Sequence, residues 1–333
     1  MNMKRRHFTR TLAAAIPVVA FGTKLFASSA DKQPCTLWQL PPQTRSQMNS
    51  YVMRTPGNEL IVIDGGRKED AAYLRTFIRE RGNHVHAWFI SHPHLDHVDA
   101  LTAIINDPGD MTIDRIYGSL PDDDWLEEHQ NANADKTQLR LKAALQKSNR
   151  KLLDLSPGQR IEFKGASFEI LSTLNPELTV NAVNNQSAVW RVDVGNTSLL
   201  FLGDLGVEGG DKLLAGPYRS RLKADYVQMS HHGQAGVSEE FYKVVNPKQC
   251  LWPTPDWLWD NNKRGQGRDS GPWKTLEVRA WMDKLNVEKH YVAKDGLHQI
   301  DIPVLTARTE SRAPNNRVET DPPNADGSAG VGH

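Results

Sequence analysis

Short runs of apolar residues alternate with amphipathic segments over most of the chain. A continuous apolar run such as residues 60–63 predicts a buried strand, whereas apolar residues three or four positions apart, as in residues 70–81, predict a helix. Strands are predicted over residues 49–54, 59–64, 84–90, 113–119, 159–163, 167–172, 184–195, 198–204, 224–230, 249–252, 287–293 and 298–304. Helices are predicted over residues 70–81, 98–106, 136–147, 238–245 and 274–285. Interleaved strands and helices of this kind predict an α/β protein.

The start of the chain has the composition of an export signal. Residues 1–30 combine a basic beginning, an apolar segment over 12–26 and small residues at the end, which predicts cleavage and removal. The alternative is a short amphipathic or membrane-anchoring helix, but the apolar segment is short, and Pro17, Gly22 and Lys24 interrupt it. We therefore expect a periplasmic or secreted protein with no transmembrane segment after the signal is removed.

The basic beginning also suggests a route of export. Arg5 and Arg6 are followed by Phe8, and this arrangement resembles a twin-arginine signal. Because that pathway carries folded proteins, the resemblance implies that a metal ion is loaded before export.

Composition places limits on the remaining chain. A length of 333 residues with 38% hydrophobic residues suits one large globular domain, predicted over 31–306. Residues 307–333 are rich in Pro, Asn, Gly, Ser and charge, which predicts a disordered tail. Without residues 1–30 the chain carries 35 basic and 40 acidic residues, a net charge of about −5. This balance disfavours binding of long nucleic acids through their phosphates and leaves a small anionic substrate as the expected partner. The oligomeric state stays open.

The chain has two cysteines, Cys35 and Cys250. One disulfide between them is compatible with export, but two unpaired thiols, with Cys250 buried in a strand, are slightly favoured. Neither cysteine has the spacing of a zinc site, so we exclude both from metal binding.

The largest concentration of potential metal-binding residues in the chain follows the apolar run 87–90. Within six positions the sequence places His92, His94, Asp96 and His97, all of which can bind a divalent metal ion. Imidazoles and carboxylates that pack together at a strand end lose hydration, and a metal ion offsets this cost. The alternative, four solvated loop residues, gives no reason for such crowding.

Two further predicted strands end in metal-binding side chains. The strand over 198–204 ends in Gly203 and Asp204, and the strand over 224–230 is followed by His231 and His232. Agreement between three strand ends is more informative than any one of them, and it predicts that they meet at one site.

The pattern His-x-His-x-Asp-His at residues 92–97 resembles the signature of the metallo-β-lactamase superfamily, and the order of the motifs extends this resemblance over roughly residues 48–300. The resemblance implies a four-layer αββα sandwich with two divalent metal ions at the rim between two sheets. The expected ions are zinc, with manganese as the alternative. The implied metal ligands are His92, His94, Asp96, His97, Asp204 and His231.

Within this set the resemblance implies separate roles. His92 and His94 hold one ion, Asp96 and His97 belong to the second, and Asp204 bridges them. Either His231 or His232 completes the second site, and the other supports the ligands or donates a proton. Asp64 is expected to support the metal loop without binding, or alternatively to be a plain turn residue. The implied catalytic residues are Asp96, Asp204 and His232.

One departure from the superfamily pattern changes the expectation. No histidine occurs between His129 and His231, where many superfamily hydrolases have one. The stretch 184–187, Asn-Asn-Gln-Ser, takes that place, with Asn185 as the weak ligand. Together with the Gly-Asp and His-His-Gly motifs it is similar to the ComEC-like branch. An amide oxygen suits harder ions better than zinc, which is the reason to keep manganese.

The resemblance implies an exported hydrolase that activates water on a phosphodiester or a related phosphoester. One alternative is hydrolysis of a lactone or β-lactam ring, which the missing histidine disfavours. The other is a non-catalytic metal-binding module, which the intact motif at residues 92–97 disfavours.

Residues 253–273 form a long, Gly-containing segment that no predicted element explains, and loops of this length tend to be functional. Three tryptophans lie in it: Trp257, Trp259 and Trp273. The segment is either a flap over the substrate or a surface insertion whose tryptophans pack on the core. Arg264 and Arg268 are candidates for contacting a small anionic ligand.

Overall fold

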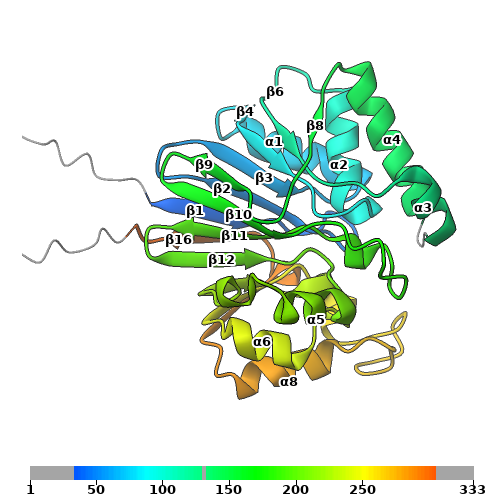
Figure 1. Cartoon of the computed structure of the whole chain (residues 1–333), viewed down its shortest axis with the longest axis vertical. Coiled ribbons are helices and arrows are strands. Elements are labelled where there is room, and N and C mark those ends of the chain that lie inside the picture. The colour runs from blue at the N-terminus through cyan, green and yellow to red at the C-terminus, as the bar shows by residue number, and fades with distance from the viewer. Residues whose placement is uncertain (1–33, 130–132, 305–333) are drawn as a thin grey trace, which may run out of the picture. The chain divides into compact units, whose positions relative to one another are not determined.

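The computed structural model describes residues 34–129 and 133–304, and its central feature is a pair of seven-stranded sheets packed face to face (Figure 1). The first sheet has the spatial order β16 (His298–Ile302), β1 (Cys35–Gln39), β2 (Ser50–Arg54), β3 (Leu60–Asp64), β5 (Ala87–Phe89), β7 (Ile116–Tyr117) and β8 (Leu152–Leu153). The second has the order β15 (Lys289–Val292), β14 (Gln249–Trp252), β13 (Tyr226–Gln228), β12 (Thr197–Phe201), β11 (Val189–Val194), β10 (Ala166–Ser172) and β9 (Arg160–Phe163). The predicted export signal over 1–30 and the predicted tail over 307–333 lie outside the described residues.

Helices cover the outer face of each sheet. The helices on the first sheet are α1 (Ala71–Arg79), α2 (Leu95–Asn106) and α4 (Ala134–Lys147). Those on the second are α5 (Val207–Ala215), α6 (Glu239–Val245) and α8 (Thr275–Lys284). The shorter helices and turns are α3 (Asp123–His129), α7 (Asp256–Trp259), η1 (Lys68–Asp70), η2 (Asn184–Gln186), η3 (Arg219–Arg221), η4 (Ser230–Gly233) and η5 (Ala293–Asp295). The predicted four-layer αββα sandwich is confirmed.

The layers explain why the strands are apolar without alternation. In β3, Ile61 and Ile63 face the core between the sheets, while Leu60 and Val62 face the helices on the outside. Side chains alternate between the faces of a strand, so a strand covered on both sides needs apolar residues at every position.

Stacked aromatic rings fill the space between the sheets. Phe89 lies parallel to Phe168 with ring centroids 4.6 Å apart, and the Trp190 ring lies 5.5 Å from Phe89. All three side chains are fully buried. This cluster joins the strand that leads to residues 92–97 with β10 and β11 of the opposite sheet.

We expect Trp190→Ala to lower the free energy of unfolding by about 3–5 kcal/mol, because it opens a cavity between the sheets. The indole N–H of Trp190 is buried and has no hydrogen-bond partner among the described residues, so Trp190→Phe, which removes that N–H, is expected to cost less. Urea unfolding of the three proteins measures both differences. Equal losses for the two variants would contradict this account of the cavity.

The direction of the strands brings their ends together. In the first sheet β3, β5, β7 and β8 are parallel, and in the second β12, β13, β14 and β15 are parallel. The carboxyl ends of parallel strands lie at one edge of a sheet, where ligands commonly bind. The segments that follow β5, β12 and β13 carry the three predicted metal motifs.

Several predicted elements need correction. The predicted strand 84–90 is two strands, because β4 (His84–Val85) pairs with β6 (Thr112–Ile113) in a separate small sheet. His86 leaves the ladder between them, and its Nδ1 accepts a hydrogen bond from the Leu60 amide. The predicted strand 113–119 is divided in the same way between β6 and β7. The sequence interpretation also missed β1 and β8.

Cys35 and Cys250 are both buried and free, as favoured from the sequence. Burial raises the pKa of the Cys35 thiol to about 12. Within the part of the chain that the structure describes, no helix is both long enough and apolar enough to cross a membrane.

Candidate metal centre

Six side chains that follow three strands, one strand from the first sheet and two from the second, converge at one place. They form two groups of potential ligands: His92, His94 and Asp204 in the first, and Asp96, His97 and His232 in the second. Within each group the ligand atoms, one per residue, lie within 4.8 Å of one another. Five of the six residues are buried, and Asp96 is partly exposed.

Asp204 lies between the two groups. Its Oδ2 is 3.3 Å from His97 Nε2, 3.5 Å from His232 Nε2 and 3.9 Å from His92 Nε2. A carboxylate in this position is able to contact ions in both groups, which is the arrangement that the bridging role of Asp204 requires.

The donor atoms have the character of a metal site. His97 Nε2, His232 Nε2 and Asp204 Oδ1 are buried, and none of them has an aligned hydrogen-bond partner among residues 34–129 and 133–304. The ion-pair contacts of these imidazoles are short, but they lack hydrogen-bond geometry. Because buried polar atoms are almost always satisfied, three convergent unsatisfied atoms indicate a missing partner. Imidazole nitrogen and carboxylate oxygen suit zinc, and they also accept manganese. The residues therefore fit a pair of divalent ions.

Burial and the neighbouring carboxylates shift the pKa values of the histidines at the site. Burial alone would lower the pKa of His232, but the Asp204 and Asp96 carboxylates outweigh it and raise that pKa to about 10. Burial likewise acts against a charged His97, and Asp204 and Asp64 raise its pKa well above the ordinary value. Protons on these two imidazoles offset the carboxylate charges when no cation is bound. Metal binding must displace them.

His92 has the opposite behaviour. Burial lowers its pKa well below the ordinary value, and the neighbouring His97 and His94 lower it further. A neutral imidazole is the form that binds a metal ion. His92 therefore offers a nitrogen ligand that needs no deprotonation.

Asp64 holds His97 in place. Asp64 Oδ2 lies 2.8 Å from His97 Nδ1 and also accepts hydrogen bonds from the Asn49 amide and the Ser91 hydroxyl. Asp64 Oδ1 accepts from the Ser91 backbone N–H at 2.8 Å. With Nδ1 engaged, His97 directs Nε2 at Asp204. This geometry favours the supporting role of Asp64 over that of a plain turn residue.

We expect Asp64→Asn to weaken metal binding by about 10- to 100-fold, because the neutral amide orients His97 less strongly. Competition with a chelating indicator measures the affinity. A matched control is Asp114→Asn, since Asp114 makes the same 2.8 Å carboxylate–histidine contact with His84 at the surface. An Asp64→Asn affinity as high as that of the control would contradict the supporting role.

The structure brings His232, and not His231, to the second group. His232 Nδ1 donates a hydrogen bond to the Pro253 carbonyl at 2.9 Å, which leaves Nε2 facing Asp96 Oδ2 at 3.2 Å. Thr254 Oγ1 donates to the His232 carbonyl at 2.6 Å and fixes the backbone there. The geometry thus favours His232 as the ligand in place of the predicted His231.

His231 lies at the rim of the site. Its Nε2 is 3.3 Å from Asn184 Nδ2, and its Nδ1 is 3.3 Å from the Ala235 carbonyl. Both His231 and His232 have left-handed backbone conformations, with φ of 51° and 56°. Two consecutive left-handed residues turn the chain sharply, so these adjacent side chains point to different surroundings.

The predicted weak ligand Asn185 does not face the ligand groups. Its Oδ1 accepts hydrogen bonds from the backbone N–H groups of Gly206 and Gly209, and its Nδ2 donates to Val180 and Glu208. These hydrogen bonds to Asn185 stabilise the first turn of α5. The expected strand over 184–195 is wrong at its beginning, because residues 184–186 form the turn η2.

A cavity of about 350 Å³ opens beside the ligands. Its lining consists of Gln47, Arg67, His94, Leu95, Asp96, Asn181, Asn184, Asp204, His231 and His232. Asn184, the neighbour of the predicted Asn185, supplies a buried amide oxygen without a partner among the described residues. The sequence interpretation also missed Arg67, whose only signal is its position directly after the Asp-Gly-Gly turn at 64–66.

Asp99, which lies two residues after the motif at 92–97, is a further acid close to the site in sequence. Asp99 forms an ion pair with Arg140 of α4 at 3.0 Å and is absent from the cavity lining. The ion pair with Arg140 therefore explains the presence of a carboxylate at position 99.

Comparisons with known proteins agree with this architecture. The profile of the Metallo-beta-lactamase superfamily matches residues 44–249, which include all six potential ligands. No curated protein matches the sequence.

Solved structures that are similar to this chain have low sequence identity to it. CmlA, a diiron β-hydroxylase from Streptomyces venezuelae, is 12% identical with a TM-score of 0.50, and the match covers 81% of this chain and 54% of CmlA. The metallo-beta-lactamase fold protein YhfI from Bacillus subtilis is 13% identical with a TM-score of 0.48, covering 80% of this chain and 100% of YhfI. Unliganded yeast PDE1 is 14% identical with a TM-score of 0.48, covering 81% of this chain and 100% of PDE1. The profile match spans more than half of the chain, and so this protein belongs to the metallo-β-lactamase superfamily.

Proposed function

We propose that this protein is an exported hydrolase that uses two divalent metal ions on a phosphodiester or a related phosphoester. The observation that carries the proposal is the convergence of two ligand groups on Asp204 beside a cavity of about 350 Å³. Membership of the superfamily supports it, because most of its members are metal-dependent hydrolases.

The proposal assigns His92 and His94 to one ion and Asp96, His97 and His232 to the other, with Asp204 shared by both. Divalent ions bound there lower the pKa of a water molecule and offset negative charge on phosphoryl oxygens. The first group has two histidines and lacks a third, so it suits manganese as well as zinc.

Residues of this chain prepare the site for that chemistry. The Asp64 carboxylate and the Pro253 carbonyl engage the Nδ1 atoms of His97 and His232, so both rings present Nε2 to the ions. Arg67 supplies a guanidinium group in the cavity lining, and its ion pair with Glu69 is long, at 3.9 Å. Guanidinium groups match the paired oxygens of a phosphate, which supports a phosphoester substrate.

The ComEC-like assignment remains part of the proposal. It rests on the Asn-Asn-Gln-Ser stretch at 184–187, the Gly-Asp at 203–204 and the His-His-Gly at 231–233. With Asn184 in the cavity lining, an amide occupies the neighbourhood in which other superfamily members are expected to have a histidine. A site with fewer imidazoles disfavours the ring-hydrolase alternative.

Metal analysis followed by activity assays tests the function. We expect two divalent ions per purified chain and turnover of bis(p-nitrophenyl) phosphate without turnover of nitrocefin. Turnover of nitrocefin or a lactone with no phosphoester activity would support the ring-hydrolase alternative. With both ions bound, inactivity towards all three substrates would support a binding module.

The proposed export rests on residues 1–30, with a mature domain over 31–306 and a tail over 307–333. We expect the double change Arg5→Lys and Arg6→Lys to keep the precursor in the cytoplasm, because a twin-arginine signal depends on both guanidinium groups. Cell fractionation measures the distribution, and Arg10→Lys is the matched control. Unchanged export of the double variant would contradict the twin-arginine route.

A further inference from the structure

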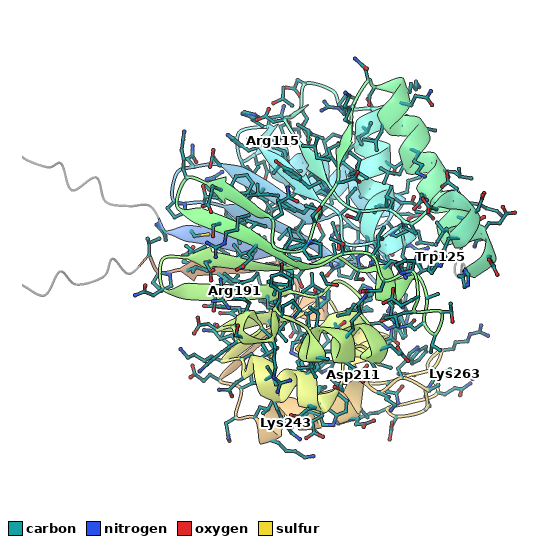
Figure 2. All side chains as sticks on the ribbon, in the orientation of Figure 1. Arg115, Trp125, Arg191, Asp211, Lys243 and Lys263 are labelled. Atoms are coloured by element: carbon teal, nitrogen blue, oxygen red, sulfur yellow. The ribbon has the colours of Figure 1, made fainter. Side chains whose placement is uncertain are left out.

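A second cavity, of about 510 Å³, is lined mainly by the segment 253–273. Trp257 and Trp273 form its aromatic wall, with ring centroids 4.7 Å apart and ring planes inclined by 64°. Arg45, Asp256 and Arg264 also line it. We call this cavity the tryptophan pocket, and Lys263 marks its segment in Figure 2.

Residues 45–47 connect the tryptophan pocket with the cavity beside the metal ligands. Trp257 Nε1 donates a hydrogen bond to the Arg45 carbonyl at 2.7 Å. Two residues later, Gln47 lines the cavity beside the metal ligands. Two residues of extended chain span at most about 7 Å, so one short segment borders both cavities.

A second connection runs through the start of the segment 253–273. The Pro253 carbonyl accepts the hydrogen bond from His232 Nδ1, and Thr254 Oγ1 donates to the His232 carbonyl. Trp257 follows three residues later, in α7. The same segment therefore orients a metal ligand and builds the wall of the tryptophan pocket.

The two tryptophans of the pocket differ from the third one in this segment. Trp259 packs edge to face on the core residue Trp252 at 5.2 Å, and the Arg279 guanidinium lies over its ring at 3.9 Å. Trp257 and Trp273 belong to none of the buried hydrophobic clusters of the described residues and remain partly exposed. Core packing thus accounts for Trp259 but not for the other two.

The charges around the pocket are available to a ligand. Arg45 and Arg264 are exposed, and neither forms an ion pair within residues 34–129 and 133–304. Indole faces stack on planar rings of many kinds, and guanidinium groups interact with both π faces and anions. Asp256 is able to accept hydrogen bonds from amino groups on such a ring. This combination suits a planar aromatic group next to a negative charge.

We propose that the tryptophan pocket is a subsite for a planar aromatic group of the substrate, joined to the phosphate that is hydrolysed at the metal centre. This inference rests on the proposed phosphoesterase function and deepens it, because it names the part of the substrate that is recognised away from the metals. The segment 253–273 is then a substrate-recognition element. The ring is that of a nucleobase or of a simpler aryl ester, and the two are distinguished below.

Binding to the metal-free full-length protein tests the subsite without any turnover. Isothermal titration compares AMP with ribose 5-phosphate, and p-nitrophenyl phosphate with methyl phosphate, so that each pair differs by a ring. We expect the ring to tighten binding by about ten-fold in at least one pair. A gain in the AMP pair alone identifies a nucleobase, and a gain in both pairs identifies aromatic rings in general.

Variants locate the effect. Trp257→Ala and Trp273→Ala are expected to abolish the ring-dependent gain, while Trp257→Phe retains part of it. Lys263→Ala is the matched control, because Lys263 lies on the same segment outside the pocket lining. Arg264→Ala, at an exposed position, gives a second test if an alanine variant of tryptophan fails to fold. Equal affinities within both pairs, or a gain that persists in folded Trp257→Ala, would overturn the proposal.

Kinetics separate this inference from the function on which it rests. For bis(p-nitrophenyl) phosphate we expect Trp257→Ala to raise KM about ten-fold and to change kcat by less than about two-fold. Hydrolysis with an unchanged KM in this variant would contradict the subsite and would still support the phosphoesterase function. Ring-dependent binding in a protein that hydrolyses no phosphoester would contradict the phosphoesterase function and would still support an aromatic binding site.

Discussion

Asp204→Ala is expected to release both metal ions and to abolish hydrolysis. Asp204 Oδ2 lies within 3.9 Å of imidazole nitrogens from both ligand groups, so no other side chain of the site replaces it. Loss of a residue that only supports a ligand typically costs 10- to 100-fold, and we expect more than about 100-fold here. Metal content by mass spectrometry and the rate with bis(p-nitrophenyl) phosphate measure the two effects.

The matched control for this variant is Asp211→Ala. Asp211 is an exposed carboxylate on α5, the helix that follows Asp204 (Figure 2). It should keep both ions and the full rate. An Asp204→Ala protein that is folded, holds two ions and retains the rate would show that Asp204 is not the bridge.

The second large effect concerns the adjacent histidines. His232→Asn is expected to lose the second ion and more than about 100-fold in rate, because His232 Nε2 faces Asp96 and Asp204. His231→Asn is expected to keep both ions. Asparagine is the suitable replacement at both positions, since it tolerates the left-handed backbone better than alanine does.

Each of these two variants is the control for the other. Metal content measured on both gives the answer independently of any substrate. If His231→Asn loses an ion and His232→Asn does not, the assignment from the geometry is wrong and the ligand set predicted from the sequence is right.

The sequence predicted the meeting of the metal motifs because the relevant strands are covered on both faces. Runs such as residues 60–63 and 87–90 are continuously apolar, so their ends were visible in the pattern. Parallel pairing aligned the ends of β3 and β5 in the first sheet and those of β12 and β13 in the second, and the packing of the two sheets brought Asp204 beside residues 92–97. Strand direction and the packing of two sheets are enough to bring the motifs together, without the side-chain details of the site.

The sequence does not show which of two neighbouring residues of the same type faces the site. His231 and His232, like Asn184 and Asn185, differ only in the backbone turn that holds them, and neither pattern nor composition encodes a left-handed pair or the turn η2. The strand β1 was also missed. Its partners are β2 and β16, and β16 lies more than 250 residues away in the chain.

The position of β1 also has a consequence for when the protein is able to fold. β1 forms ladders along both of its sides, and one of the partners is β16, in which Ile302 lies opposite Cys35. A ribosome-bound chain that has not yet released residues 298–302 leaves one side of β1 without backbone partners. The first sheet is therefore completed only after residues 298–302 have been synthesised, so a translation product that ends before them lacks the native form of this sheet.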